Sequence, residues 1–276
     1  MIKLNRLFLI CIGLVLLSCE KEVTQVDAVK VDDHQELWVD KTEVYLPVTK
    51  EWTNRVEVAD INGDQQLDMI FANGGNYSAP GTLESSRVFI NQGPEKKFQE
   101  ITSQIFGEDK FISRVIKVRD INNDDIPDIL LGTTYQTQSQ LYMGLGNGKF
   151  ENVTSSHLPN IIASVGDLEL GDVDHDGDLD IVLVDWGPGS NMNNTGGRTM
   201  LWLNDGNGNF TDATTTQMPE LLIQFSWDVE FFDFDNMFSF VKVQLLFMLN
   251  KLKLAVEPTS IVFSSIPKID VKAVNF

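Results

Sequence analysis

Residues 172–180 read DVDHDGDLD, a nine-residue stretch with acidic side chains at positions 1, 3, 5 and 9. The same pattern, with Asn at position 3, begins again at Asp60 and at Asp120, so the copies start 60 and 52 residues apart. Carboxylate and amide oxygens are the hard ligands that Ca²⁺ takes in proteins. The pattern therefore predicts a repeated calcium site, with these ligands: Asp60, Asn62, Asp64, Asp68, Asp120, Asn122, Asp124, Asp128, Asp172, Asp174, Asp176 and Asp180.

A solvated acidic turn is the alternative to a metal site. Asp and Asn are common in turns because their side chains hydrogen-bond to the nearby backbone. Three copies in phase, each with similar flanks, favour the metal site over the solvated turn. Every predicted ligand belongs to a tight turn, so we expect calcium to stabilise the fold and not to take part in catalysis.

The flanks of each copy predict β-strands. Apolar and charged residues alternate before each loop, as in Val56-Glu57-Val58, and a run of apolar residues follows it, as in Met69-Ile70-Phe71. The first pattern is typical of a half-buried strand and the second of a buried one. Two more short strands are expected in each copy, parted by turn residues such as those at 146–148. Four strands in each unit indicate one blade of a β-propeller.

The EF-hand is the competing calcium motif, and the residues exclude it. An EF-hand loop needs a bidentate Glu at position 12 and a helix on each side. Position 12 is Phe71, Leu131 or Leu183 in this chain, and the flanks alternate with a period of two. The loop is therefore expected to join two strands.

These features resemble the FG-GAP/VCBS repeat family, whose calcium loops read D-x-[DN]-x-D-G-x-x-D within propeller blades, as in integrin alpha subunits. The resemblance covers residues 52–236, and only the third copy carries the family's Gly at position 6, namely Gly177; Gln65 and Asp125 stand there in the others. It implies an all-β fold, a β-propeller-type array of four-stranded blades with calcium-binding hairpin loops. It also implies a backbone carbonyl ligand at position 7, which is Gln66, Ile126 or Asp178.

The N-terminus resembles that of a bacterial lipoprotein. A basic start at residues 1–6 precedes an apolar run at 7–17, and Ser18 and Cys19 follow as in a lipobox. We expect a signal peptide at 1–18, a lipidated Cys19 with a tether at 19–45, and the repeats at 46–236. This predicts a lipid-anchored protein of the bacterial cell envelope, at the outer membrane. An ordinary signal peptide with a chance Cys is the alternative.

Residues 237–276 depart from the repeat. A fourth copy begins at Asp233 and Asp235 and stops after Asn236, and the segment that follows contains no glycine. We expect three blades and the start of a fourth, which is an incomplete propeller. Our hypothesis for the tail is a frameshift or a broken gene model. A genuine C-terminal segment that covers the open edge of the last blade is the alternative.

A binding or adhesion module is expected in place of an enzyme. A formal net charge of −19 disfavours nucleic acid as a partner. The three histidines, His34, His157 and His175, have no recognisable nucleophile nearby in sequence, so no catalytic residue is predicted. The expected partner is a glycan or a surface protein. The alternatives are the propeller domain of a polysaccharide lyase and a non-catalytic scaffold of an envelope complex.

Two polar loops are candidates for the ligand site. Tyr77 lies in the loop of the first copy, and Trp186 and Arg198 flank the equivalent loop of the third. An aromatic ring can stack on a sugar, and an Arg can pair with a carboxylate. A flexible insertion without a ligand is the alternative.

Overall fold

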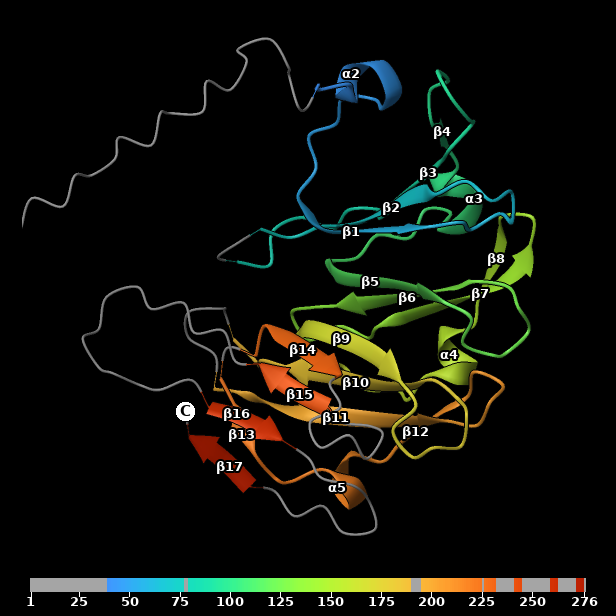
Figure 1. Cartoon of the computed structure of the whole chain (residues 1–276). Coiled ribbons are helices and arrows are strands. Elements are labelled where there is room, and N and C mark those ends of the chain that lie inside the picture. Colours follow the sequence, from blue (N-terminus) through green and yellow to red (C-terminus); the bar gives the residue numbers. More distant parts are fainter. Residues whose placement is uncertain are drawn as a thin grey trace, which may run out of the picture. The chain divides into compact units, whose positions relative to one another are not determined.

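The computed structural model describes residues 39–76, 79–189, 195–224 and 226–231, and the backbone of three strands beyond them (Figure 1). The chain divides into two units, Met1–Thr42 and Glu43–Phe276, and the second contains all the sheets. The predicted signal peptide, Cys19 and Tyr77 lie outside the described residues, as does the tether before residue 39. Within the described part, no helix is long and apolar enough to cross a bilayer.

Four antiparallel sheets follow one another along the chain, and in each the first four strands are paired in sequence order. Three helices of one turn, α3 (Thr102–Ile105), α4 (Thr154–His157) and α5 (Thr214–Gln217), follow the fourth strand of sheets 1, 2 and 3. A further helix, α2 (Thr42–Tyr45), precedes sheet 1. The all-β prediction of four-stranded units is confirmed. Sheet 1 comprises β1 (Thr53–Ala59), β2 (Asp68–Asn73), β3 (Arg87–Ile90) and β4 (Gln99–Glu100); sheet 2 comprises β5 (Ser113–Arg119), β6 (Asp128–Thr133), β7 (Gln140–Gly146) and β8 (Lys149–Asn152); sheet 3 comprises β9 (Val165–Gly171), β10 (Asp180–Asp185), β11 (Gly197–Asn204) and β12 (Phe210–Asp212), with β13 (Leu222–Ile223) beside β11; sheet 4 comprises β14 (Asp228–Phe231), β15 (Val241–Gln244), β16 (Thr259–Val262) and β17 (Lys272–Asn275).

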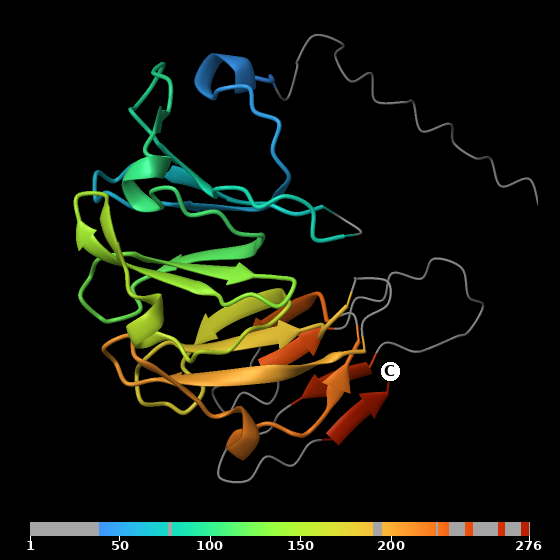
Figure 2. The same ribbon diagram turned by 180° about the vertical axis from the view of Figure 1, so that it is seen from behind.

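The first strands of the four sheets lie side by side. β1 packs beside β5, β5 beside β9, and β9 beside β14 (Figures 1 and 2). The alternate charged residues of these strands pair between sheets: Arg119 lies 2.8 Å from Glu57, and Lys117 contacts Glu169. The charges that interrupt the apolar pattern in the sequence therefore join neighbouring sheets, as expected for blades around a common axis.

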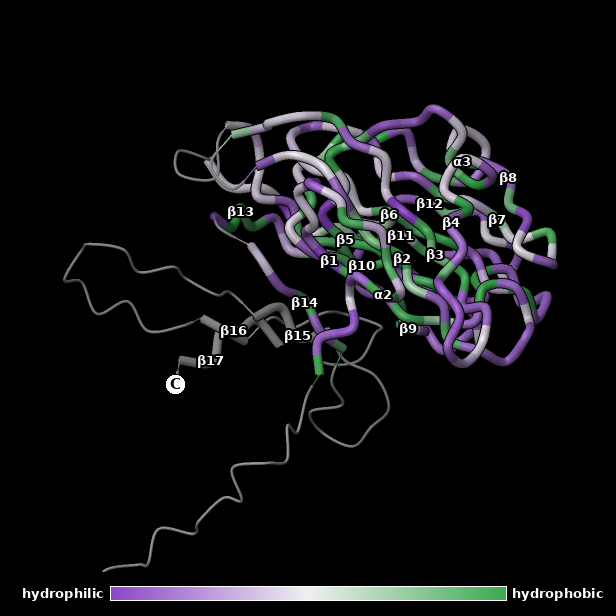
Figure 3. Tube along the Cα trace, turned by 90° about the horizontal axis from the view of Figure 1, so that it is seen from above, coloured by the Kyte–Doolittle hydropathy of each residue, from purple (hydrophilic) through white to green (hydrophobic). Residues whose placement is uncertain are grey.

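Apolar side chains of the first strands of sheets 2 and 3 fill the space between each of these sheets and the one before it. Val118 of β5 lies in one core with residues of sheet 1, and Leu168 of β9 lies in another with residues of sheet 2. Figure 3 shows the hydrophobic residues concentrated along the strands and hydrophilic residues in most loops. The equivalent residues of sheet 1, Val56 and Val58, are 47% and 51% exposed. Among the described residues, this side of sheet 1 therefore has no covering sheet.

The tail contributes strands to the fourth sheet. β15, β16 and β17 fall within residues 237–276 and extend β14 in the antiparallel order of the other sheets. The sequence pattern predicts only the first strand of this sheet, because neither the acidic loop nor the glycine turns recur after Asn236. The frameshift hypothesis concerns the origin of this segment and stays a prediction.

Candidate metal centre

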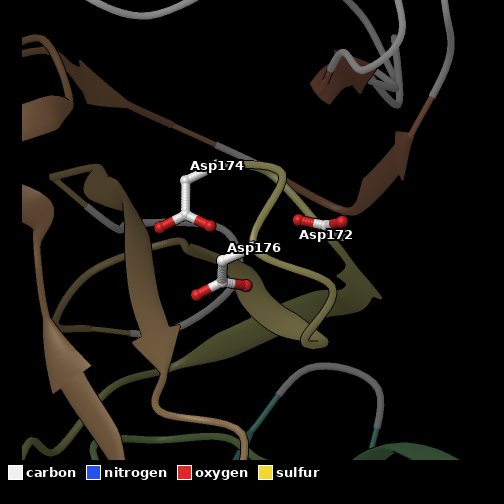
Figure 4. A group of neighbouring side chains, drawn as sticks. All are labelled: Asp172, Asp174 and Asp176. Carbon is white, nitrogen blue, oxygen red and sulfur yellow. The ribbon is translucent and has the colours of Figure 1, made fainter.

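Three carboxylates converge in the loop between β9 and β10. Asp172, Asp174 and Asp176 each place a carboxylate oxygen within 4.8 Å of the others (Figure 4). Partial desolvation, together with the neighbouring charges of Asp176 and Asp172, raises the pKa of the largely exposed Asp174 above its usual value. Mutual repulsion of this kind is relieved by a cation, so the donor set fits a hard divalent metal.

The backbone of this loop curls around its own acids. Asp172 accepts hydrogen bonds from the backbone N–H groups of His175, at 2.7 Å, and Gly177, at 3.2 Å. Asp176 accepts one from Asp178 at 3.0 Å. These bonds hold the side chains of Asp172 and Asp176, at positions 1 and 5, within the turn.

In the first two loops, backbone N–H groups also donate to the Asp at position 1. Asp60 accepts backbone N–H groups of Gly63, Asp64 and Gln65, and Asp120 accepts those of Asp124 and Asp125. Each of these loops carries two carboxylates and one amide at positions 1, 3 and 5, where the third loop carries three carboxylates.

The amides at position 3 of these two loops are hydrogen-bonded within their own loop. The amide groups of Asn62 and Asn122 donate to the carboxylates at position 5, at 3.1 and 2.9 Å. The side-chain oxygen of Asn122 is buried and has no hydrogen-bond partner. A buried acceptor without a donor is costly, and a cation would satisfy it. The second loop therefore also fits a metal.

Positions 4 and 6 have left-handed backbone in all three loops. The φ angles are +79° and +67° at Gly63 and Gln65, +60° and +65° at Asn123 and Asp125, and +67° and +98° at His175 and Gly177. The family motif places its glycine at position 6 only, so the left-handed residue at position 4 was not predicted. Non-glycine residues pay a steric cost in this conformation, and Asn and Asp pay least. The first two loops therefore have the same left-handed backbone at position 6 as the third loop, although Gln65 and Asp125 stand there in place of glycine.

The Asp at position 9 has a different environment from positions 1, 3 and 5. Asp68, Asp128 and Asp180 are fully buried at the start of the second strand of each sheet. Burial raises the pKa of Asp128 and of Asp180 to about 6. The structure does not group Asp180 with the three carboxylates of its loop, so its role as a ligand stays a prediction.

Each position-9 carboxylate binds two backbone N–H groups. One belongs to position 2 of its own loop and the other to the third strand of its sheet or the turn that follows it. The donors are Ile61 and Asn91 for Asp68, Ile121 and Gly144 for Asp128, and Val173 and Asn204 for Asp180, at 2.7–3.0 Å. The residue that the pattern marked as a ligand is thus also the link between loop and sheet. Its place at the first residue of a buried strand is the signal that could have shown this.

The region that contains the three acidic loops matches a known protein family. A scan against protein families matches the FG-GAP-like repeat twice, over residues 60–131 and 120–183. Residues 60–183 are FG-GAP-like repeats. Each match begins at the first Asp of one loop and ends in the second strand of the next sheet, so the FG-GAP-like repeats include all three acidic loops. No curated protein matches the chain.

Trp186 and Arg198, which were predicted to contact a glycan or a protein, lie outside the three acidic loops. Trp186, which follows β10, is only 2% exposed, and its ring packs edge-on against Tyr135 and Trp227, with centroids 5.7 and 4.7 Å away. The guanidinium of Arg114 lies over Trp227 at 4.6 Å. Arg198 is half-buried in β11. The sequence could not predict this aromatic cluster, because Tyr135, Trp186 and Trp227 come from three different sheets and loops.

Proposed function

We propose that the FG-GAP-like repeats form a calcium-stabilised binding module. The observation that carries the proposal is the convergence of Asp172, Asp174 and Asp176 within 4.8 Å in a loop that recurs in two further sheets. Bound calcium would neutralise these acids and cross-link each turn. The chain's own residues supply the rest: they shape the turn through the bonds to Asp172 and attach it to the sheet through Asp180.

Calcium titration by calorimetry tests this proposal on the whole mature protein. We expect about three sites, one per loop, with affinities in the range of other all-protein oxygen sites. The double variant Asp174→Asn/Asp176→Asn should remove one site and leave the fold intact, because both side chains are exposed. A matched control is Asp205→Asn, whose carboxylate belongs to a turn outside the three loops and caps Asn207 and Asn209. Absence of any calcium-dependent heat would refute the proposal.

We also propose that Cys19 anchors this module to the outer membrane of a bacterial envelope. The support is the order of a basic start, an apolar run of residues 7–17 and Ser18-Cys19. Two or more acyl chains give stable anchoring, whereas one chain alone is marginal. Metabolic labelling with a fatty acid should mark the wild-type protein and not Cys19→Ser. Equal labelling of both proteins would contradict the anchor.

The proposed partner is a glycan or a protein at the cell surface. The support is the aromatic cluster of Tyr135, Trp186 and Trp227 with Arg114, in which Tyr135 and Trp227 remain partly exposed. Partly exposed aromatic rings beside a guanidinium are typical of recognition surfaces. Glycan-array and pull-down experiments with the wild type and Trp227→Ala would identify the class of partner. Retained binding by the variant would place the ligand site elsewhere.

A further inference from the structure

The second and third acidic loops contact each other through a side-chain hydrogen bond. The amide of Asn123, at position 4 of the second loop, donates to the carboxylate of Asp178, at position 7 of the third loop, at 2.8 Å. These residues lie 55 positions apart in the chain. The contact therefore joins two candidate metal loops that belong to different sheets.

One buried amide makes a second link between the same two loops. The side-chain N–H₂ of Asn204 donates to the carbonyl of Ile121 in the second loop, at 2.8 Å, and to that of Leu179 in the third, at 3.1 Å. Its backbone N–H donates to Asp180 at 2.9 Å. Because Asn204 is buried, loss of these bonds would leave carbonyl groups of both loops without a partner.

The first and second loops provide an internal comparison. Position 4 of the first loop is Gly63, which has no side chain to reach the second loop. The residue of β7 that stands where Asn204 stands in sheet 3 is Gly144, since both donate their N–H to the position-9 Asp. A Cβ atom at Gly144 would lie 2.5 Å from the carbonyl oxygen of Pro127, so no side chain fits there. Neither bridge can therefore form between the first and second loops.

We propose that the second and third loops bind calcium cooperatively, with Asn123 and Asn204 as positioning residues, while the first loop binds independently. The inference rests on the proposed function, since it requires that the loops bind calcium. An ion in the third loop fixes the segment that contains Asp178 and Leu179. Through the two asparagines it also orders the second loop, whose own ion then loses less conformational entropy on binding.

Hydrogen exchange measured peptide by peptide during a calcium titration reports each loop separately. In Asp174→Asn/Asp176→Asn, which disables the third loop, the calcium concentration for half-protection of residues 120–128 should rise by about fivefold or more. Protection of residues 60–68 should keep its wild-type midpoint. In an Asn123→Gly background, the disabling pair should shift the midpoint of residues 120–128 by a smaller factor, because only the Asn204 link remains.

Asn204→Gly is the second uncoupling variant and reproduces the residue found at Gly144. Asn91→Gly is its matched control, because the amide of Asn91 donates to Leu67 of its own loop, at 3.2 Å. Coupling should be weakened in Asn204→Gly, where only the Asn123 link remains, and kept at its wild-type strength in Asn91→Gly. If Asn204→Gly does not fold, Asn123→Gly still decides the question, since the Asn123 contact lies at the exposed surface.

The outcomes separate the two proposals. Calcium-dependent protection of all three loops, with no effect of the disabling pair on residues 120–128, would overturn the coupling and leave calcium binding in place. A shift that persists unchanged in Asn123→Gly and in Asn204→Gly would also overturn it, because charge alone would then explain the effect. Absence of calcium-dependent protection in every loop would overturn both proposals.

Discussion

The carboxylate of Asp180 accepts the backbone N–H of Asn204 at 2.9 Å, and its other oxygen accepts that of Val173 at the same distance. This residue thus attaches the acidic loop to the third strand of its sheet. Asp180→Ala would leave two buried N–H groups without an acceptor, at a cost of about 3 kcal/mol in the free energy of unfolding. Urea denaturation in the presence of a chelator measures this cost without any contribution from metal.

The control for this prediction is Asp174→Ala, which removes an exposed acid from the same loop. Without metal its effect should stay within about 0.5 kcal/mol, as for most surface substitutions. Equal destabilisation by both variants would show that the position-9 Asp has no structural role of its own.

Asp167 of β9 predicts a dependence of stability on pH. Burial, and then a hydrogen bond with Asp228, raise the pKa of Asp167 to about 7, although Arg55 and Lys117 act in the opposite direction. The folded protein therefore holds a proton that the unfolded chain releases near its usual value of 3.8. The resulting stabilisation is full below that value and is lost as the pH rises toward 7.

Asp167→Asn tests this dependence, because the amide keeps the shape of the side chain and cannot titrate. The wild type should lose stability relative to Asp167→Asn between pH 4 and 8, as followed by urea midpoints at each pH. The slopes should be compared in chelator, so that metal binding does not contribute. Parallel slopes for the two proteins would rule out Asp167 as the source.

The exposed side of sheet 1 predicts unequal effects of the same substitution at equivalent positions. Val118 is 4% exposed and Val58 is 51% exposed. Val118→Ala should lower the free energy of unfolding by about 2 kcal/mol, because it leaves a cavity in a packed core. Val58→Ala should change it by less than about 0.5 kcal/mol. A large effect at Val58 would mean that this face is covered in solution.

The left-handed residues of the loops predict a gain from glycine. Gln65→Gly should remove the steric cost of φ +67° and stabilise the first loop by about 0.5–1 kcal/mol, after allowance for the entropy of glycine. Gly177→Ala should destabilise the third loop by about 1–2 kcal/mol. Gln65→Ala is the control and should be nearly neutral, since both residues carry a Cβ. Thermal melting in the presence of a chelator gives the order of stability of the three variants.

The sequence allowed the loops and the strands around them to be predicted because their spacing repeats. The acids at Asp60, Asp120 and Asp172 locate each turn, and the alternation around Val118 locates a first strand. The role of Asn204 could not be predicted, because its partner Ile121 lies in another sheet. The burial of Trp186 could not be predicted either, because its ring packs against Tyr135 and Trp227, which follow or precede strands of other sheets. The strands β15 to β17 carry no repeat pattern, so local sequence could not locate them.

Calcium is proposed to stabilise these FG-GAP-like repeats, and thermal melting with and without calcium tests this proposal most directly. A site at 100 times its dissociation constant contributes about 2.7 kcal/mol, and each kcal/mol raises Tm by about 2–4 °C in a domain of this size. Excess calcium should therefore raise Tm by about 5 °C or more at neutral pH, and chelator should reverse the rise. Coincident melting curves in calcium and in chelator would contradict the claim.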